Sequence, residues 1–156
     1  MIILFAAALA ACQPGASSDG VSGNVSGLSE AGLELTPLTV TKANGETHRF
    51  SVEIARTPEQ QERGMMFRES MGEDEGMIFP YANADFRSFW MKNTLIPLDI
   101  IYVKPDKTIA NIAAMTQPMS LDFHYSTEPV NLVLELKGGR AAELGIQPGD
   151  KVEWPK

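Results

Sequence analysis

The sequence predicts a mainly β (α+β) fold, either a compact antiparallel sheet or a small barrel-like domain with one or two short helices. Short strand-like runs follow one another, turn residues separate them, and only two brief segments favour a helix. A chain of 156 residues is about one domain by length, and its hydrophobic fraction of 44% can build a core without disulfides or structural metal. We therefore expect a single β-rich domain over residues 33–156.

The N-terminus predicts a secreted and anchored protein. Residues 1–11, MIILFAAALAA, suit a signal peptide because they are apolar but too short to span a bilayer as a helix. The quartet LAAC, ending at Cys12, resembles the bacterial lipobox, in which the cysteine is lipidated and becomes the first mature residue. An uncleaved signal, or a small buried cysteine, is the alternative, and no Lys or Arg precedes the apolar run.

The segment after the cysteine predicts a flexible tether. Residues 12–32 are rich in Gly and Ser and lack periodic apolar positions, so they would span about 25 Å as a random coil. We expect lipid anchoring at Cys12 on the periplasmic side of the cell envelope. By resemblance to Gram-negative lipoproteins, Gln13 in place of Asp favours the outer membrane.

The first two elements of the domain predict a β-hairpin. Residues 35–42 and 48–55 are strand-like, and Asn44-Gly45 between them is a strong signal for a tight turn. In the second run apolar and polar residues alternate, which predicts an antiparallel strand with one face in water.

A short helix should follow the hairpin. Thr57 suits the N-cap, Pro58 the first helical position, and Gln60 completes a capping box. The helix should run to about Arg63, where Gly64 can adopt the left-handed conformation that closes it.

The remainder of the chain alternates strand-like runs with turns. These runs occupy residues 77–79, 86–92, 96–103, 108–115 and 130–136. Pro97 places its strand at an edge or at a strand start, because proline has no N–H for the sheet. VNLVLEL, residues 130–136, is nearly all apolar and predicts a deeply buried strand. A helical turn should end near Leu144.

Composition excludes several classes of protein. Thirteen basic and 20 acidic residues give a net charge of −7, which repels phosphate backbones, so we expect no nucleic-acid partner. One cysteine permits no intramolecular disulfide, and with two histidines it cannot form a Cys-rich zinc site. We expect no metal and no cofactor.

FWMKNTLIPLDI, residues 89–100, is the strongest candidate for a site. Polar groups interrupt a stretch that is otherwise apolar, and a ring, a cation and hydrogen-bonding groups together suit a polar small molecule or a glycan. We expect a ligand-binding or partner-binding module. Its predicted binding residues are Arg68, Tyr81, Trp90, Lys92, Asn93 and Asp99.

Two other interpretations of this stretch remain open. Lys92 and Asp99 could form a structural ion pair, with Asn93 capping backbone groups and Trp90 filling the core. Alternatively, a hydrolase-like site could use Asp99 or Glu135 as base and Lys92 to stabilise negative charge. Glu135, a carboxyl in a buried strand, is the position where we expect a strongly shifted pKa.

Weaker patterns point to other chemistry. Ser120, Asp122 and His124 lie close in sequence, but a catalytic triad is defined by geometry rather than by spacing. Thioethers can bind Cu(I), although here the methionines lack a regular spacing and also suit gaps in a small core. They are Met65, Met66, Met71, Met77, Met91, Met115 and Met119.

Five phrases together resemble the domain-of-unknown-function family 192, a bacterial and archaeal group. They are RGMMFRESM (63–71), GMIFPY (76–81), FWMKNTLIPLDIIYV (89–103), VLELKGG (133–139) and GIQPGDKV (145–152). The resemblance covers roughly residues 38–154. It implies one small, mostly β domain that is often secreted or lipid-anchored, and it brings no established activity.

Overall fold

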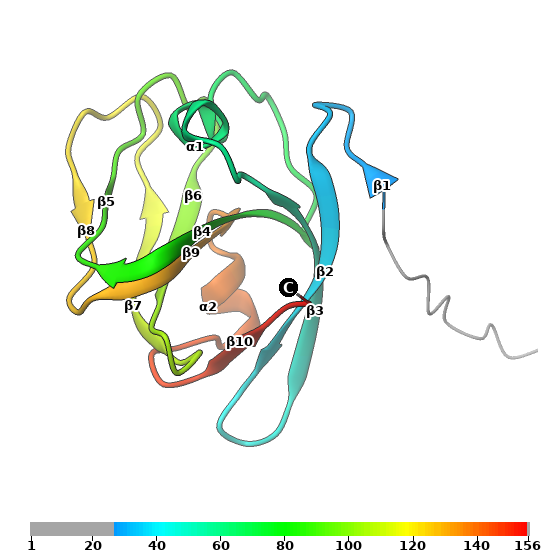
Figure 1. Ribbon diagram of the computed structural model, residues 1–156, viewed down its shortest axis with the longest axis vertical. Coiled ribbons are helices and arrows are strands. Elements are labelled where there is room, and N and C mark those ends of the chain that lie inside the picture. The colour runs from blue at the N-terminus through cyan, green and yellow to red at the C-terminus, as the bar shows by residue number, and fades with distance from the viewer. Residues whose placement is uncertain (1–26, 156) are drawn as a thin grey trace, which may run out of the picture.

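The computed structural model describes residues 27–155, which form a mainly β domain with two short helices (Figure 1). The predicted fold class is confirmed. The strands are β1 (Gly27–Leu28), β2 (Glu34–Thr41), β3 (Thr47–Ile54), β4 (Glu75–Asp85), β5 (Ser88–Phe89), β6 (Leu98–Val103), β7 (Ile109–Thr116), β8 (His124–Tyr125), β9 (Val130–Lys137) and β10 (Lys151–Glu153). The helices are α1 (Pro58–Arg63) and α2 (Arg140–Leu144).

The predicted signal peptide, Cys12 and most of the predicted tether lie outside the described residues. The fold itself begins six residues before the predicted start at residue 33, because β1 pairs with Glu34 and Leu35 at the beginning of β2. Within residues 27–155, no helix has the length and apolar character that a membrane span requires.

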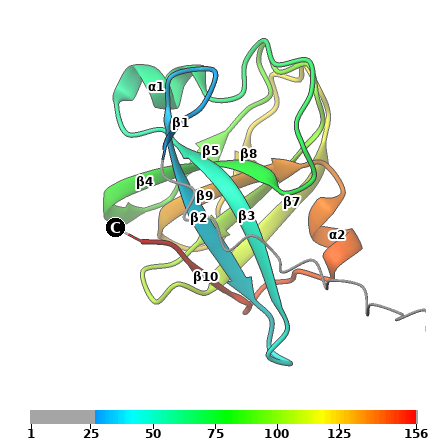
Figure 2. The ribbon, with the colours of Figure 1, turned by 90° about the vertical axis from the view of Figure 1, so that its right-hand side faces the viewer.

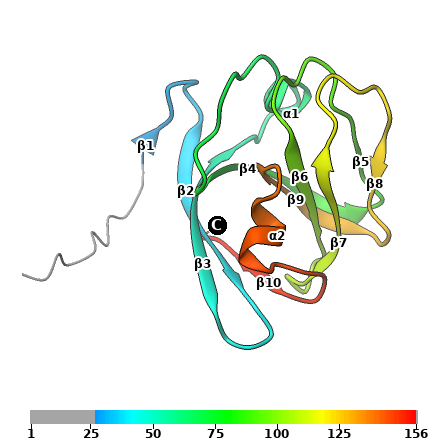
Figure 3. The same cartoon turned by 180° about the vertical axis from the view of Figure 1, so that it is seen from behind.

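The main sheet has the strand order β1-β2-β3-β4-β9-β6-β7, with β10 also paired to β2. It curves strongly (Figures 1 and 3) but does not close into a barrel. The pair β3–β4 is parallel, because the chain crosses through α1 between them, and the other pairs are antiparallel. The sheet is therefore mixed, where the sequence predicted an antiparallel one.

Local signals in the sequence placed two elements well. β2 and β3 form the predicted hairpin, which projects from the body of the domain (Figure 2), and Gly45 has a φ of 86° in its turn. Helix α1 has the predicted capping box, with the Thr57 hydroxyl accepting a hydrogen bond from the Gln60 N–H. Gly64 ends the helix at the predicted position, but with φ 45° and ψ −128° it does not adopt the left-handed helical conformation that the sequence predicted.

Both faces of the sheet are covered, so the domain has two cores. The first lies inside the curve, where α2 packs against leucines and valines of β2, β3 and β9 (Figure 3). The second lies on the opposite face, under residues 64–71 and 89–97. Strand β9 lies between the two cores, which explains why nearly all of VNLVLEL is apolar.

The small sheet β5–β8 belongs to this second layer (Figure 1). Phe89 of β5 packs edge-on against Phe79 and Tyr102, with ring centroids 4.9 and 6.3 Å away. The Tyr102 hydroxyl donates a 2.7 Å hydrogen bond to the carbonyl of His124 in β8. These contacts fix the two short strands on the domain.

Candidate functional site: an aromatic surface and a separate acidic pocket

The six predicted binding residues do not converge on one site. Asp99 is inside the domain, Trp90 and Lys92 lie on an exposed surface, and Arg68 lines a pocket near β1. Asn93 and Tyr81 have local partners of their own. Lys92 and Asp99 form no ion pair within the described part of the chain, so the structural pair considered from the sequence is wrong.

Asp99 is a structural residue. Its side chain is completely buried, and its carboxylate accepts three backbone hydrogen bonds of 2.8–2.9 Å from the N–H groups of Met115, Gly139 and Ala141. These donors belong to β7 and to the start of α2, so Asp99 joins β6 to two neighbouring elements. A ligand cannot reach a carboxylate that is enclosed in this way, and the prediction that Asp99 binds one is therefore wrong.

Trp90 and two aromatic residues missed in the sequence form an exposed aromatic surface. The Trp90 and Phe123 rings are stacked, 5.4 Å apart at an angle of 9°, and Tyr125 follows 6.2 Å from Phe123. Their exposed fractions are 38%, 48% and 64%. Lys92 places its Nζ 5.0 Å from the centre of the Trp90 ring. We call these four residues the aromatic surface.

The pairing of β5 with β8 produces this arrangement. Phe89 pairs with His124, so Trp90, which directly follows β5, lies opposite Phe123, which directly precedes β8. Side chains alternate between the faces of a strand, and since Phe89 points into the core, Trp90 points outward. The sequence SLDFHYS did not predict these aromatic partners, because Phe123 and Tyr125 become neighbours of Trp90 only through the pairing of two segments that are distant in sequence.

Asn93 shapes the loop beside this surface. It has a φ of 56°, and its carbonyl accepts a 2.8 Å hydrogen bond from the N–H of Phe67. Its side-chain amide lies 3.9 Å from the sulfur of Met66. Asn93 therefore connects two loops through these contacts. Asparagine suits the position because it tolerates the left-handed conformation better than most residues.

Tyr81 is half-buried near the middle of β4. The guanidinium of Arg87 lies 3.8 Å from the centre of its ring, which is a close cation–π contact. Burial raises the pKa of Tyr81, while Arg87 acts in the opposite direction. Arg87 therefore covers one face of the Tyr81 ring.

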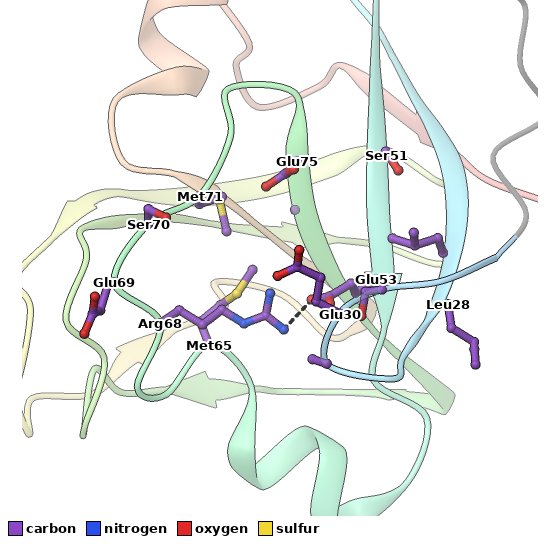
Figure 4. A pocket seen from close by; sticks show the side chains of 14 residues that line it. Leu28, Glu30, Ser51, Glu53, Met65, Arg68, Glu69, Ser70, Met71 and Glu75 are labelled. Carbon is purple, nitrogen blue, oxygen red and sulfur yellow. Dashed lines mark ion pairs between the residues drawn. The ribbon is translucent and has the colours of Figure 1, made fainter.

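Arg68 lies in a pocket of about 770 Å³ that sequence reasoning did not foresee (Figure 4). Its Nη2 is 2.5 Å from Oε2 of Glu53, a buried carboxylate of β3. Glu53 of β3 pairs with Met77 of β4, and Met77 pairs in turn with Glu135 of β9. The three residues therefore lie in one row across the sheet. The alternation in β3 had assigned Glu53 to a wet face, but the loop at 64–72 covers it.

Glu135 has the shifted pKa that the sequence led us to expect. Burial raises the pKa of this carboxyl to about 8, and the positive charge of Arg68 only partly offsets the effect. Its Oε2 is buried and finds no hydrogen-bond partner among the described residues.

The geometry of the described residues does not support the hydrolase, catalytic-triad or metal-site hypotheses. Lys92 is exposed on Trp90, Asp99 is fully bonded, and Glu135 is buried beside Arg68, so the three do not form a hydrolase site. Ser120 Oγ donates to Asp122, 3.2 Å away, while His124 Nε2 finds no partner within residues 27–155. No serine, histidine and aspartate relay exists there. In the described chain, no group of three His, Cys, Asp or Glu side chains could hold a metal.

Comparisons with known proteins identify a family and several similar solved structures. The DUF192 family, described as uncharacterized ACR, matches residues 39–154. A crystal structure of a protein of unknown function from Novosphingobium aromaticivorans is 44% identical, with a TM-score of 0.82, and the match covers 90% of this chain and 100% of that one. A second structure, from Sinorhizobium meliloti, is 38% identical with a TM-score of 0.76, over 78% of this chain and 95% of that one. That protein is described as a proposed transcription regulator. None of the curated proteins matches the chain.

Proposed function

Because this chain belongs to the DUF192 family, which brings no activity with it, we propose a function from the surface itself: a lipid-anchored envelope module that binds acidic glycans. The glycan would lie on the aromatic surface of Trp90, Phe123 and Tyr125. Lys92 would contact a negatively charged substituent of the sugar. The observation that carries this proposal is the row of three exposed, contiguous rings beside the ammonium group of Lys92, which forms no ion pair with another residue in the range 27–155.

The rings suit the flat apolar faces of sugars. A pyranose ring presents C–H groups on one face and hydroxyl groups around its edge, so it can pack on an aromatic ring while its hydroxyls remain in water. Successive rings 5.4 and 6.2 Å apart offer contacts along a chain rather than at one point. Phe123 and Tyr125 are 48% and 64% exposed, well beyond what a core role would leave.

Lys92 gives the surface its preference for charge. It is exposed and lies over Trp90, and it forms no ion pair with a described residue. A carboxylate on the sugar would supply the missing partner. The protein as a whole carries a net charge of −7, so general attraction of anions is weak and a local cation has to provide the selectivity.

The cellular place of this module is part of the proposal. The LAAC sequence at Cys12 supports lipidation, and a tether of about 25 Å would let the domain reach glycans beside the membrane. Mass spectrometry of the natively expressed protein tests this directly. An acylated N-terminal Cys12 is expected, whereas an intact leader without acyl mass would contradict it.

The description of the Sinorhizobium protein as a regulator of transcription does not transfer well to this chain. DNA binding relies on Lys and Arg side chains that neutralise phosphates. Here 20 acidic residues outnumber 13 basic ones, and the aromatic surface has a single lysine. A DNA-binding role would also be incompatible with anchoring at the envelope.

The binding proposal is tested with two tetrasaccharides of equal length, one of uronic acids and one of neutral glucose units. Isothermal titration calorimetry should show tighter binding of the acidic sugar, and Lys92→Ala should abolish this preference. Tyr125→Ala should weaken both sugars by about two- to tenfold, since an aromatic contact contributes about 0.5–1.5 kcal/mol.

Leu28→Ala is the matched control, because Leu28 is comparably exposed but lies in β1, away from the small sheet. It should bind both sugars like the wild type. If neither sugar binds at millimolar concentration, glycan recognition is wrong, and the exposed rings must serve another partner.

A further inference from the structure

A second site lies in the pocket that contains Arg68, on the outer side of β3 and β4. The turn between β1 and β2 forms one wall, and the loop at 65–72 forms the opposite wall (Figure 4). Its volume of about 770 Å³ is large enough for a small organic molecule. None of its lining residues belongs to the aromatic surface, so the two sites are independent.

The lining of this pocket is strongly acidic. Its carboxylates are Glu30, Glu53, Glu69 and Glu75, and its one basic side chain is Arg68. The difference, four negative charges against one positive charge, is a net charge of −3 at the pocket wall. Charge of one sign around a concave, partly enclosed surface raises the local concentration of ions of the other sign.

The one positive group is already engaged. Arg68 extends across the pocket toward Glu53 and forms an ion pair with it, Nη2 to Oε2, 2.5 Å apart (Figure 4). The other three lining glutamates form no ion pair with any residue in the range 27–155. Three of the four carboxylates that line the pocket therefore have no cationic partner among the described residues.

Glu53 is the buried carboxylate of the pocket, and it has a single partner. Glu53 is only 5% exposed, and the Arg68 guanidinium, at its Oε2, is the one partner of its carboxylate among the described residues. Glu135, two strands away in the same row of the sheet and thus about 10 Å distant, has a buried oxygen without a hydrogen-bond partner among the described residues, but it does not line the pocket. A carboxylate has about four lone-pair sites, so Glu53, which lines the pocket and has a single partner, can accept a further hydrogen bond from a ligand donor.

The rest of the lining defines the kind of cation. Met65, Met71 and Leu35 provide apolar wall, and thioethers adapt well to flexible aliphatic chains. Among the described residues no cluster of metal-ligating side chains is present here or elsewhere. The lining therefore fits an organic cation better than a metal ion.

We propose that this pocket binds an aliphatic amine, with the ammonium group at Glu53 and Glu30 and the carbon chain along Met65 and Met71. The ammonium group offers three N–H donors, which match the remaining acceptor capacity of Glu53 and the carboxylate of Glu30, for which no ion pair is formed within residues 27–155. The amine would join Arg68 as the second cation of the site. The acidic groups around the rim would attract it from solution.

The test is calorimetric titration of the full chain with 1,6-diaminohexane, with hexanoate as a probe of the same chain length and opposite charge. The diamine should bind, with affinity that falls as salt is added, and hexanoate should not. Glu30→Gln should weaken the diamine about two- to fivefold, the range expected for one exposed charge pair. Glu53→Gln should weaken it more, since its carboxylate is buried.

Glu62→Gln is the charge-matched control, because it removes one exposed carboxylate from α1, outside the pocket. Circular dichroism establishes that each variant is folded, and Glu30→Gln keeps the test decisive if Glu53→Gln does not fold. The proposal is overturned if the diamine fails to bind at 10 mM (roughly the limit of a useful affinity). It is equally overturned if hexanoate binds as well, or if Glu62→Gln weakens binding as much as Glu30→Gln. Sugar binding to the aromatic surface is unaffected by either result.

Discussion

Replacing Asp99 by asparagine separates a structural role from a binding role most sharply. The Asp99 carboxylate accepts hydrogen bonds from Met115 and Gly139 through Oδ1 and from Ala141 through Oδ2. The amide of asparagine keeps one oxygen and turns an NH₂ group toward one of these donors. At least one buried N–H group, at Ala141 if the oxygen keeps its two partners, then loses its acceptor.

The magnitude follows from these contacts. A hydrogen bond to a charged group contributes about 1.5–3 kcal/mol, and a buried donor without a partner costs about 1–3 kcal/mol. We expect Asp99→Asn to lower the free energy of unfolding by about 2–4 kcal/mol. Asp99→Ala would expose all three donors and could remove most of the 5–15 kcal/mol that is typical of a small domain, so asparagine is the more informative change.

Urea unfolding followed by circular dichroism measures this difference. Asp122→Asn is the control, since Asp122 is exposed in a loop, and it should change the free energy of unfolding by less than about 0.5 kcal/mol. Folded Asp99→Asn should still bind sugars on the aromatic surface. An Asp99→Asn protein as stable as the wild type, or one that has lost only sugar binding, would refute the structural role.

Two further substitutions test the buried carboxyl of Glu135 and the close packing at Gly138. Glu135→Gln should stabilise the protein above about pH 5, because folded Glu135 holds its proton up to a pKa of about 8 while the carboxyl of the unfolded chain ionises near its ordinary pKa of 4.5. The wild type therefore loses stability between these pH values, and the variant should gain on the order of 3 kcal/mol at pH 7 and nothing at pH 4, as urea unfolding at both pH values will show. Gly138→Ala should destabilise the protein by about 1–3 kcal/mol in the same assay, since a Cβ there would lie 2.8 Å from the backbone of Pro97. Equal stability in that variant would show that the turn can move aside.

Much of the fold was predictable because its signals are local. The Asn44-Gly45 turn, the capping box at Thr57 and the apolar run of β9 each depend on a few neighbouring residues. The parallel pairing of β3 with β4 was missed because it depends on where the chain returns after α1, and a strand reads alike in either direction.

The candidate site was only partly predictable for the same reason. FWMKNTLIPLDI contains Trp90 and Lys92, which are exposed, together with Asp99, which is buried, and their linear spacing cannot distinguish the two environments. Asp99 was predicted to bind a ligand because its true partners are backbone N–H groups from β7 and α2. Every residue except proline has such a group, so the sequence does not show which of them a carboxylate will contact. The burial of Glu53 was not predicted, because the loop that covers it follows α1 and its sequence does not show which strand it packs on.

The central claim is that the exposed aromatic surface holds an acidic sugar. It is tested most directly by nuclear magnetic resonance of the ¹⁵N-labelled protein, in which Trp90 and Trp154 each give one indole N–H signal. Adding the uronic acid tetrasaccharide should shift the Trp90 signal progressively and leave the Trp154 signal in place, because Trp154 packs against the first core beside Arg56. A Trp90 signal that stays unchanged at saturating sugar would contradict the claim.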